Sequence, residues 1–202
     1  MKKILVQVVA GLLLVGCAAT GPVWKPVSNV DEFTDVSTKM VTVGEYAGGS
    51  LVVTQSLKYY PFVAIQNGEL FVGVRSGGRF RVPTGTVQIR IDANPAWTIT
   101  PDETPVALVP SVPTMQMEGM PQSVDMAGLQ KLAMANVTKM MSPYTAATGD
   151  KAKSIIRQML TGKVIKYRTI GMNQAASTTG EVKLDASFAA ALKSVGIDPE
   201  SI

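Results

Sequence analysis

The pattern of hydrophobic and polar positions changes along the chain from alternation to helical spacing. Between residues 40 and 100, short segments rich in β-branched and aromatic side chains alternate apolar with polar positions, which is typical of strands with one buried face. Val87, Ile89 and Ile91, for example, are separated by polar residues. The predicted strands in this region are residues 51–54, 62–66, 69–74, 79–82 and 86–92.

Turn-forming residues separate these strands. Asn67-Gly68 lies between two of them, and a two-residue hairpin turn with positive φ at both positions favours these residue types. Residues 76–78 and 83–85 supply Gly and Pro for the next reversals. We therefore predict an antiparallel meander of four consecutive strands.

Helical spacing follows a proline-rich connector at residues 101–122. Helices are predicted over residues 123–142, 148–162 and 185–196, because each begins at a capping residue and ends at Pro or Gly. Residues 164–170 have the composition of one more strand. The predicted fold class is α+β, an antiparallel β meander or small sandwich followed by a mainly helical C-terminal half.

The same patterns divide the chain into four parts. Gly21-Pro22 and Pro26 stand in a stretch without periodicity, which favours a tether. The predicted parts are a signal peptide at 1–16, a lipid-anchored tether at 17–36, a β-rich region at 37–109, and a mainly helical region at 110–202 that packs on the same core.

The N-terminus has the layout of an export signal. Lys2 and Lys3 precede an apolar stretch, and small residues follow it. The uninterrupted apolar run, residues 8–19, has 12 residues, whereas a membrane-spanning helix needs roughly 20. The pattern therefore predicts a cleaved signal peptide.

Leu14-Val15-Gly16-Cys17 resembles the lipobox of bacterial lipoproteins, and Cys17 is the sole cysteine of the chain. The resemblance implies that the Cys17 sulfur carries a diacylglycerol and that this residue begins the mature protein. It also implies an outer-membrane location, because Ala18 rather than Asp follows the cysteine. The alternative is an ordinary secretory signal with an incidental cysteine.

Residues 62–92 separately resemble the PEGA-type β modules of envelope proteins. This likeness identifies no ligand.

Composition excludes several classes of chemistry. The 202 residues include no His and one Cys, so catalytic triads, imidazole zinc sites and internal disulfides are excluded. Without the signal peptide, 17 basic residues stand against 15 acidic ones, which disfavours nucleic acid as a partner. The chain also has no SxxK, G-x-S-x-G or phosphate-loop motif, so we predict that it is not an enzyme and needs no cofactor beyond the acyl chains on Cys17.

Methionines form the first candidate site. Seven of the 11 fall between residues 115 and 141, and thioether sulfur is a soft ligand that suits Cu(I) or Ag(I). Met115, Met117 and Met120 lie close enough in sequence to form a three-coordinate site. The alternative is that the methionines of this region fill the core or cover an apolar groove or partner.

Arginines form the second candidate. Arg75, Arg79, Arg81 and Arg90 fall within sixteen residues of the predicted meander. Such a cluster is suited to phosphate or carboxylate groups of lipopolysaccharide, peptidoglycan or a partner protein. The alternative is a solvated outer face that prevents aggregation at sheet edges.

Taken together, the sequence predicts an outer-membrane-anchored lipoprotein that faces the periplasm and has a structural or accessory binding role in the cell envelope. The expected partners are the membrane, through the lipid anchor, and an envelope protein. The alternative function is a periplasmic binding protein for soft metals such as copper or silver.

Overall fold

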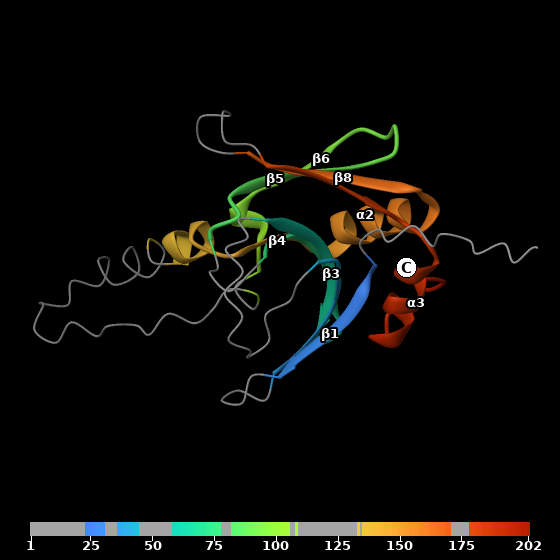
Figure 1. The fold of residues 1–202 in the computed structure, drawn as a ribbon. Helices are drawn as coiled ribbons and strands as arrows, with labels where there is room; N and C mark the ends of the chain where they lie inside the picture. Colours follow the sequence, from blue (N-terminus) through green and yellow to red (C-terminus); the bar gives the residue numbers. More distant parts are fainter. Residues whose placement is uncertain are drawn as a thin grey trace, which may run out of the picture.

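The chain is mostly β, with strands arranged in two antiparallel sheets (Figure 1). The computed structural model describes residues 23–30, 36–44, 58–77, 82–105, 108, 133, 135–170 and 178–202. The five-stranded sheet has the order β1-β2-β3-β4-β7, with strands β1 (Lys25–Val30), β2 (Ser37–Thr42), β3 (Tyr59–Gln66), β4 (Glu69–Ser76) and β7 (Tyr144–Ala147). The four-stranded sheet has the order β6-β5-β8-β9, with strands β5 (Thr86–Ile91), β6 (Trp97–Ile99), β8 (Val164–Ile170) and β9 (Thr179–Lys183).

Helices accompany the sheets rather than form a separate half. The 3-10 helix η1 (Pro101–Glu103) follows β6, and α2 (Gly149–Thr161) and α3 (Ala186–Ser194) follow β7 and β9. Residues 135–140 are also helical. Figure 1 shows α2 and α3 beside the two sheets, where both helices contribute buried residues to the same core.

The main core lies between the sheets. Alternation along β5 places Val87, Ile89 and Ile91 inside, while the five-stranded sheet contributes buried valines from β2, β3 and β4. Ile155 and Ile156 of α2 join the same core. The five-stranded sheet is buried on its other face as well, where a second apolar cluster contains Met40, Phe62, Ala64, Phe71, Leu108 and Ala146.

The hairpin predicted at Asn67-Gly68 is confirmed. β3 pairs with β4 in antiparallel register, with Gln66 opposite Glu69. The turn residues have φ of 51° and 81°, which are the positive values that a two-residue turn of this type requires.

The predicted meander, however, is wrong. β4 pairs with β3 and β7, whereas β5 belongs to the other sheet. Backbone hydrogen bonds tie the end of β4 and the segment before β5 to the residues before β7, from Ser76 N to Pro143 O at 2.8 Å and from Thr84 N to Ser142 O at 3.0 Å. These bonds bring β7 beside β4. The next strand along the chain, β5, pairs instead with β6 and β8 in the other sheet.

The predicted helical C-terminal half is also wrong, and with it the α+β fold class. α2 and α3 lie where they were predicted, although Thr148 makes no side-chain cap hydrogen bond and α3 ends at Ser194, before Gly196. However, β7, β8 and β9 lie in the same half. Residues 145–147 read Thr-Ala-Ala, and alanine favours a helix when local preference alone is considered. Their backbone groups instead pair with β4, where Gly73 allows a close approach: a Cβ there would lie 1.9 Å from the Thr145 oxygen.

The expected tether at residues 17–36 contains part of the folded domain. All six residues of β1 pair with β2. The side chain of Trp24 is 2% exposed. Its Nε1 donates to the Lys183 oxygen at 2.8 Å, and its ring centroid lies 4.7 Å from that of Phe188. The chain therefore joins the core at Trp24, because this side chain packs where β9 ends and α3 begins.

Candidate anion-binding face

The outer side of the four-stranded sheet carries a set of polar and charged side chains. Strand alternation sends Ile89 and Ile91 into the core, so Gln88 and Arg90 point outward. The register extends this surface across β8 and β9, because Arg90 is opposite Lys166 and Lys166 is opposite Glu181. We call this surface the basic face; it consists of Gln88, Arg90, Thr98, Lys166, Arg168, Thr179, Glu181 and Lys183.

Positive charge dominates the basic face. Its charged side chains are four cations and the single carboxylate of Glu181, a net charge of +3. The Lys166 Nζ lies 3.4 Å from Glu181 Oε2, and both side chains are 59% exposed, so solvent screens this pair strongly. Arg90 stands opposite Lys166 in the strand register, where like charges are unfavourable, and its Nη2 donates to the Ala93 oxygen at 3.3 Å.

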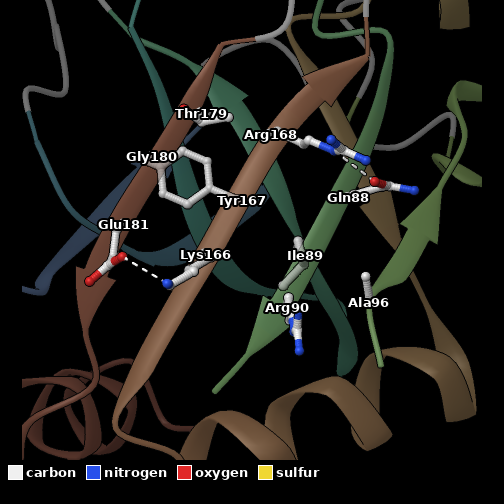
Figure 2. Close-up of a pocket in the computed structure, with 10 residues that line it drawn as sticks. All are labelled: Gln88, Ile89, Arg90, Ala96, Lys166, Tyr167, Arg168, Thr179, Gly180 and Glu181. Carbon is white, nitrogen blue, oxygen red and sulfur yellow. Dashed lines mark hydrogen bonds and ion pairs between the residues drawn. The ribbon is translucent and has the colours of Figure 1, made fainter. Parts of the chain in front are cut away.

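Hydrogen bonds orient one end of the face. Arg168 Nε donates to Gln88 Oε1 at 2.7 Å (Figure 2). Gln88 Nε2 in turn donates to Thr98 Oγ1 at 3.0 Å. The bond to Gln88 engages one of the five N–H donors of the guanidinium group. This arrangement holds the Arg168 group along the sheet surface, where it can meet an anionic oxygen from solvent.

A groove of about 620 Å³ runs over this surface, lined by residues of β5, β8 and β9 together with Ala96 (Figure 2). Gly180 lies opposite Tyr167 in the register. A Cβ on Gly180 would lie 2.3 Å from the Tyr167 ring, so the absence of a side chain lets the ring pack beneath β9. The groove therefore presents cations, the Glu181 carboxylate and the Thr179 hydroxyl above an apolar interior.

Tyr167 is a core residue rather than a reactive group. Burial, together with the nearby Tyr60, raises the pKa of the Tyr167 hydroxyl to about 12, although Arg75 acts in the opposite direction. The hydroxyl is therefore uncharged at neutral pH.

The predicted arginine cluster is divided by the fold. Arg75 is 3% exposed; its Nε donates to Thr42 Oγ1 at 2.9 Å and its Nη2 to the Val43 oxygen at 3.1 Å. Its guanidinium carbon also lies 5.1 Å from the centroid of the Tyr60 ring. Arg75 thus belongs to the interior on the side of the five-stranded sheet, whereas Arg90 lies on the basic face. Arg79 and Arg81 lie outside the described residues.

The basic residues of β8 and β9 were missed by the sequence prediction. Residues 164–170 were predicted as a strand from their composition alone, although the alternation Val-Ile-Lys-Tyr-Arg at residues 164–168 is a signal that could have placed Lys166 and Arg168 on its polar side. The alternation does not show that this side adjoins Arg90, because the two strands are far apart in sequence. Lys183 was missed because β9 itself was not predicted.

The candidate metal site, Met115, Met117 and Met120, lies outside the described residues, as does Cys17. Met140 and Met141 are described, and both are exposed. The alternative that the methionines of this region fill the core is therefore wrong for these two.

Glu103 is the described acidic residue with the shortest ion pair. Glu103 Oε2 lies 2.5 Å from Lys151 Nζ, and Glu103 Oε1 accepts the Thr100 N–H at 3.0 Å, so this carboxylate fastens η1 to α2. Over the same ranges, no group of three His, Cys, Asp or Glu residues is arranged to hold a metal ion.

In the part of the chain that the structure describes, no helix is long and apolar enough to cross a membrane. Comparison of the chain with protein-family models, with curated proteins and with solved structures finds no significant match.

Proposed function

We propose that this chain is a bacterial envelope lipoprotein that acts by binding rather than by catalysis. Cys17 would carry the acyl chains and hold the protein in the outer membrane on its periplasmic side. The proposal is supported by the basic N-terminus, the apolar segment, the lipobox-like Leu14-Val15-Gly16-Cys17 and the Ala at position 18. The domain would act as an accessory component of an envelope assembly.

The observation that supports binding is the pairing of Arg90 with Lys166 on an open sheet face, beside Arg168. Adjacent cations with one carboxylate among them are more stable when an anionic group lies between them. Arg is well suited to the planar, bidentate recognition of carboxylate or phosphate. The binding partner is therefore an envelope component with anionic groups.

Anchoring is tested by fractionating cells that express the wild type or Cys17→Ser, with membranes washed in high salt to screen charge-based adsorption. We expect the wild type to remain in the membrane and to incorporate labelled palmitate. The variant should be released and unlabelled. A Cys17→Ser protein that resists the salt wash would contradict the proposal.

Binding is tested by crosslinking in cells with a C-terminally tagged protein, followed by mass spectrometry. The Arg90→Ser/Lys166→Ser variant removes two charges from the basic face. The Lys39→Ser/Lys153→Ser variant is the matched control, because it removes two charges from exposed positions on β2 and α2. We expect crosslinks at the basic face to be lost in the first variant alone. Equal capture by both variants would show that the face is not the binding surface.

A further inference from the structure

We infer that the basic face lies on the anionic phospholipid headgroups of the same membrane leaflet in which Cys17 is anchored. The inference rests on the proposed lipidation of Cys17 and names the partner of the basic face. Three features support it: the short distance between the anchor and the fold, the place where the chain enters the domain, and the distribution of charge around that place.

The first feature is the length of the tether. Trp24 is held in the core, and it follows Cys17 by seven residues. Seven extended residues span at most about 25 Å. A tether that ended at residue 36 would reach roughly 65 Å, so the packing of Trp24 confines the domain to the neighbourhood of the lipid surface.

The second feature is the point of entry. Trp24 Nε1 donates to the backbone oxygen of Lys183, at the end of β9. The side chain of Lys183 alternates with buried Val182 and so belongs to the outer surface of the sheet. The tether thus reaches the domain at one edge of the basic face. A sheet layer is about 10 Å thick, so the tether is long enough for this face to lie flat on the membrane.

The third feature is charge. Besides β1, which begins directly after Trp24 at Lys25, two surfaces near the entry point differ in charge: the basic face, with a net charge of +3, and the C-terminal segment from 184 to 202. That segment carries Asp185, Asp198 and Glu200 against Lys193, a net charge of −2. An anionic surface attracts the first and repels the second, so the orientation with β5, β8 and β9 toward the lipid is favoured.

The mode of contact is superficial. The large hydrophobic side chains that are exposed within the described ranges are Val23, Val30, Val137, Met140 and Met141, and none of them belongs to the basic face. Val164, on the same side of β8, is half-buried. The described part of this face therefore has no exposed large apolar side chain to insert between acyl chains, and its contact with lipid is electrostatic. Arg90 and Arg168 would meet headgroup phosphates, for which guanidinium groups are well suited. Acyl chains and a basic surface together form a two-part attachment.

The test uses the mature chain with Cys17→Ser, so that only the domain itself holds the membrane. Sedimentation is measured with vesicles of phosphatidylethanolamine and phosphatidylglycerol, and with vesicles of phosphatidylcholine alone. We expect at least tenfold stronger binding to the anionic vesicles and loss of that binding in high salt. Equal binding to both kinds of vesicle would overturn the inference, and this comparison requires no variant.

Variants identify the surface that binds. Arg90→Ser/Lys166→Ser should lower the affinity for anionic vesicles by roughly tenfold or more. The reason is that each basic residue near the membrane surface raises the affinity about fivefold. Lys39→Ser/Lys153→Ser should bind like the parent, and equal urea midpoints would show that all variants are folded. Equal losses in the two double variants would overturn the inference.

Two further outcomes separate this inference from the proposed function. Saturable binding of inorganic phosphate at the basic face without vesicle binding would assign the face to a free anion. Crosslinks from the face to an envelope protein without vesicle binding would leave the accessory function in place and overturn the lipid assignment. Vesicle binding by a protein that incorporates no palmitate would instead overturn the lipidation at Cys17.

Discussion

Replacing Trp24 with alanine should lower the free energy of unfolding by about 3–5 kcal/mol, the range for a large aromatic residue in a core. The side chain is 2% exposed and packs 4.7 Å, centroid to centroid, from Phe188, a contact worth about 1 kcal/mol beyond its buried area. Truncation also leaves the Lys183 oxygen without the indole donor at 2.8 Å. The loss of this hydrogen bond costs about 1–3 kcal/mol, which is already part of the total of about 3–5 kcal/mol. Trp24→Phe keeps most of the packing and should lose about 2 kcal/mol.

The measurement is urea unfolding of the mature chain with Cys17→Ser, followed by far-ultraviolet circular dichroism. A loss of about 4 kcal/mol lowers the midpoint by roughly 2 M when the denaturant slope is about 2 kcal/mol per molar urea. Val23→Ala is the matched control, because this neighbouring side chain is 52% exposed. Its effect should remain within about 0.5 kcal/mol.

An unchanged midpoint for Trp24→Ala would refute the reasoning. It would mean that this residue is not part of the core and that residues 23–30 behave as a tether. The limit of about 25 Å between Cys17 and the domain would then no longer hold. The result therefore bears on the orientation of the basic face as well as on stability.

Three other perturbations test particular contacts. Gly73→Ala places a Cβ 1.9 Å from the Thr145 backbone oxygen, so it should displace β7 and cost about 3 kcal/mol; an unchanged urea midpoint would contradict the pairing of β4 with β7. The pKa of Tyr167 is raised to about 12 from 10.0, so the unfolded chain ionises first and stability should fall by roughly 2–3 kcal/mol between pH 10 and 12. Tyr167→Phe should lack this loss, and an absorbance titration in which every tyrosine ionises near pH 10 would contradict the burial. Burial acts to raise the pKa of Glu103, but hydrogen bonds, chiefly from Lys151, outweigh it and hold the pKa below 4.5. Its contribution to stability is therefore present above pH 4.5 and lost as the pH falls through the folded-state pKa; Glu103→Gln should unfold with a shallower acid dependence, and an identical dependence would count against the contact.

Elements with contiguous signals could be predicted from the sequence. The span of α2 follows from apolar spacing between Thr148 and Gly162, and Asp185 marks the start of α3, where its carboxylate accepts the Ser187 N–H. The Asn67-Gly68 turn required only two adjacent residues. In each case the atoms that stabilise the element are a few residues apart, so a short window of sequence contains the whole reason for it.

Strands that depend on distant partners could not be predicted in this way. β7 contains two alanines, and β9 contains a glycine and a single buried valine. Neither has a convincing strand pattern of its own. Their conformation is set by backbone hydrogen bonds to β4 and β8, and such tertiary pairing overrides weak local preference.

The candidate site shows the same division. The outward direction of Arg90 followed from alternation along β5, but its neighbour Lys166 lies 76 positions later in the chain. Arg75 and Arg90 looked like members of one cluster until the fold placed them on different sheets. The likeness of Cys17 and its preceding residues to a lipobox is contiguous, and the lipidation that it implies stays a prediction.

The sequence by itself therefore determined the elements whose signals are contiguous, and the inward and outward positions of an alternating strand such as β5. The tertiary structure alone decided which strands are neighbours, that Trp24 ends the tether, and that cations from three strands share one surface. The physical reason is that helices and turns satisfy their backbone groups within a few residues, whereas a strand must find its donors and acceptors in another segment.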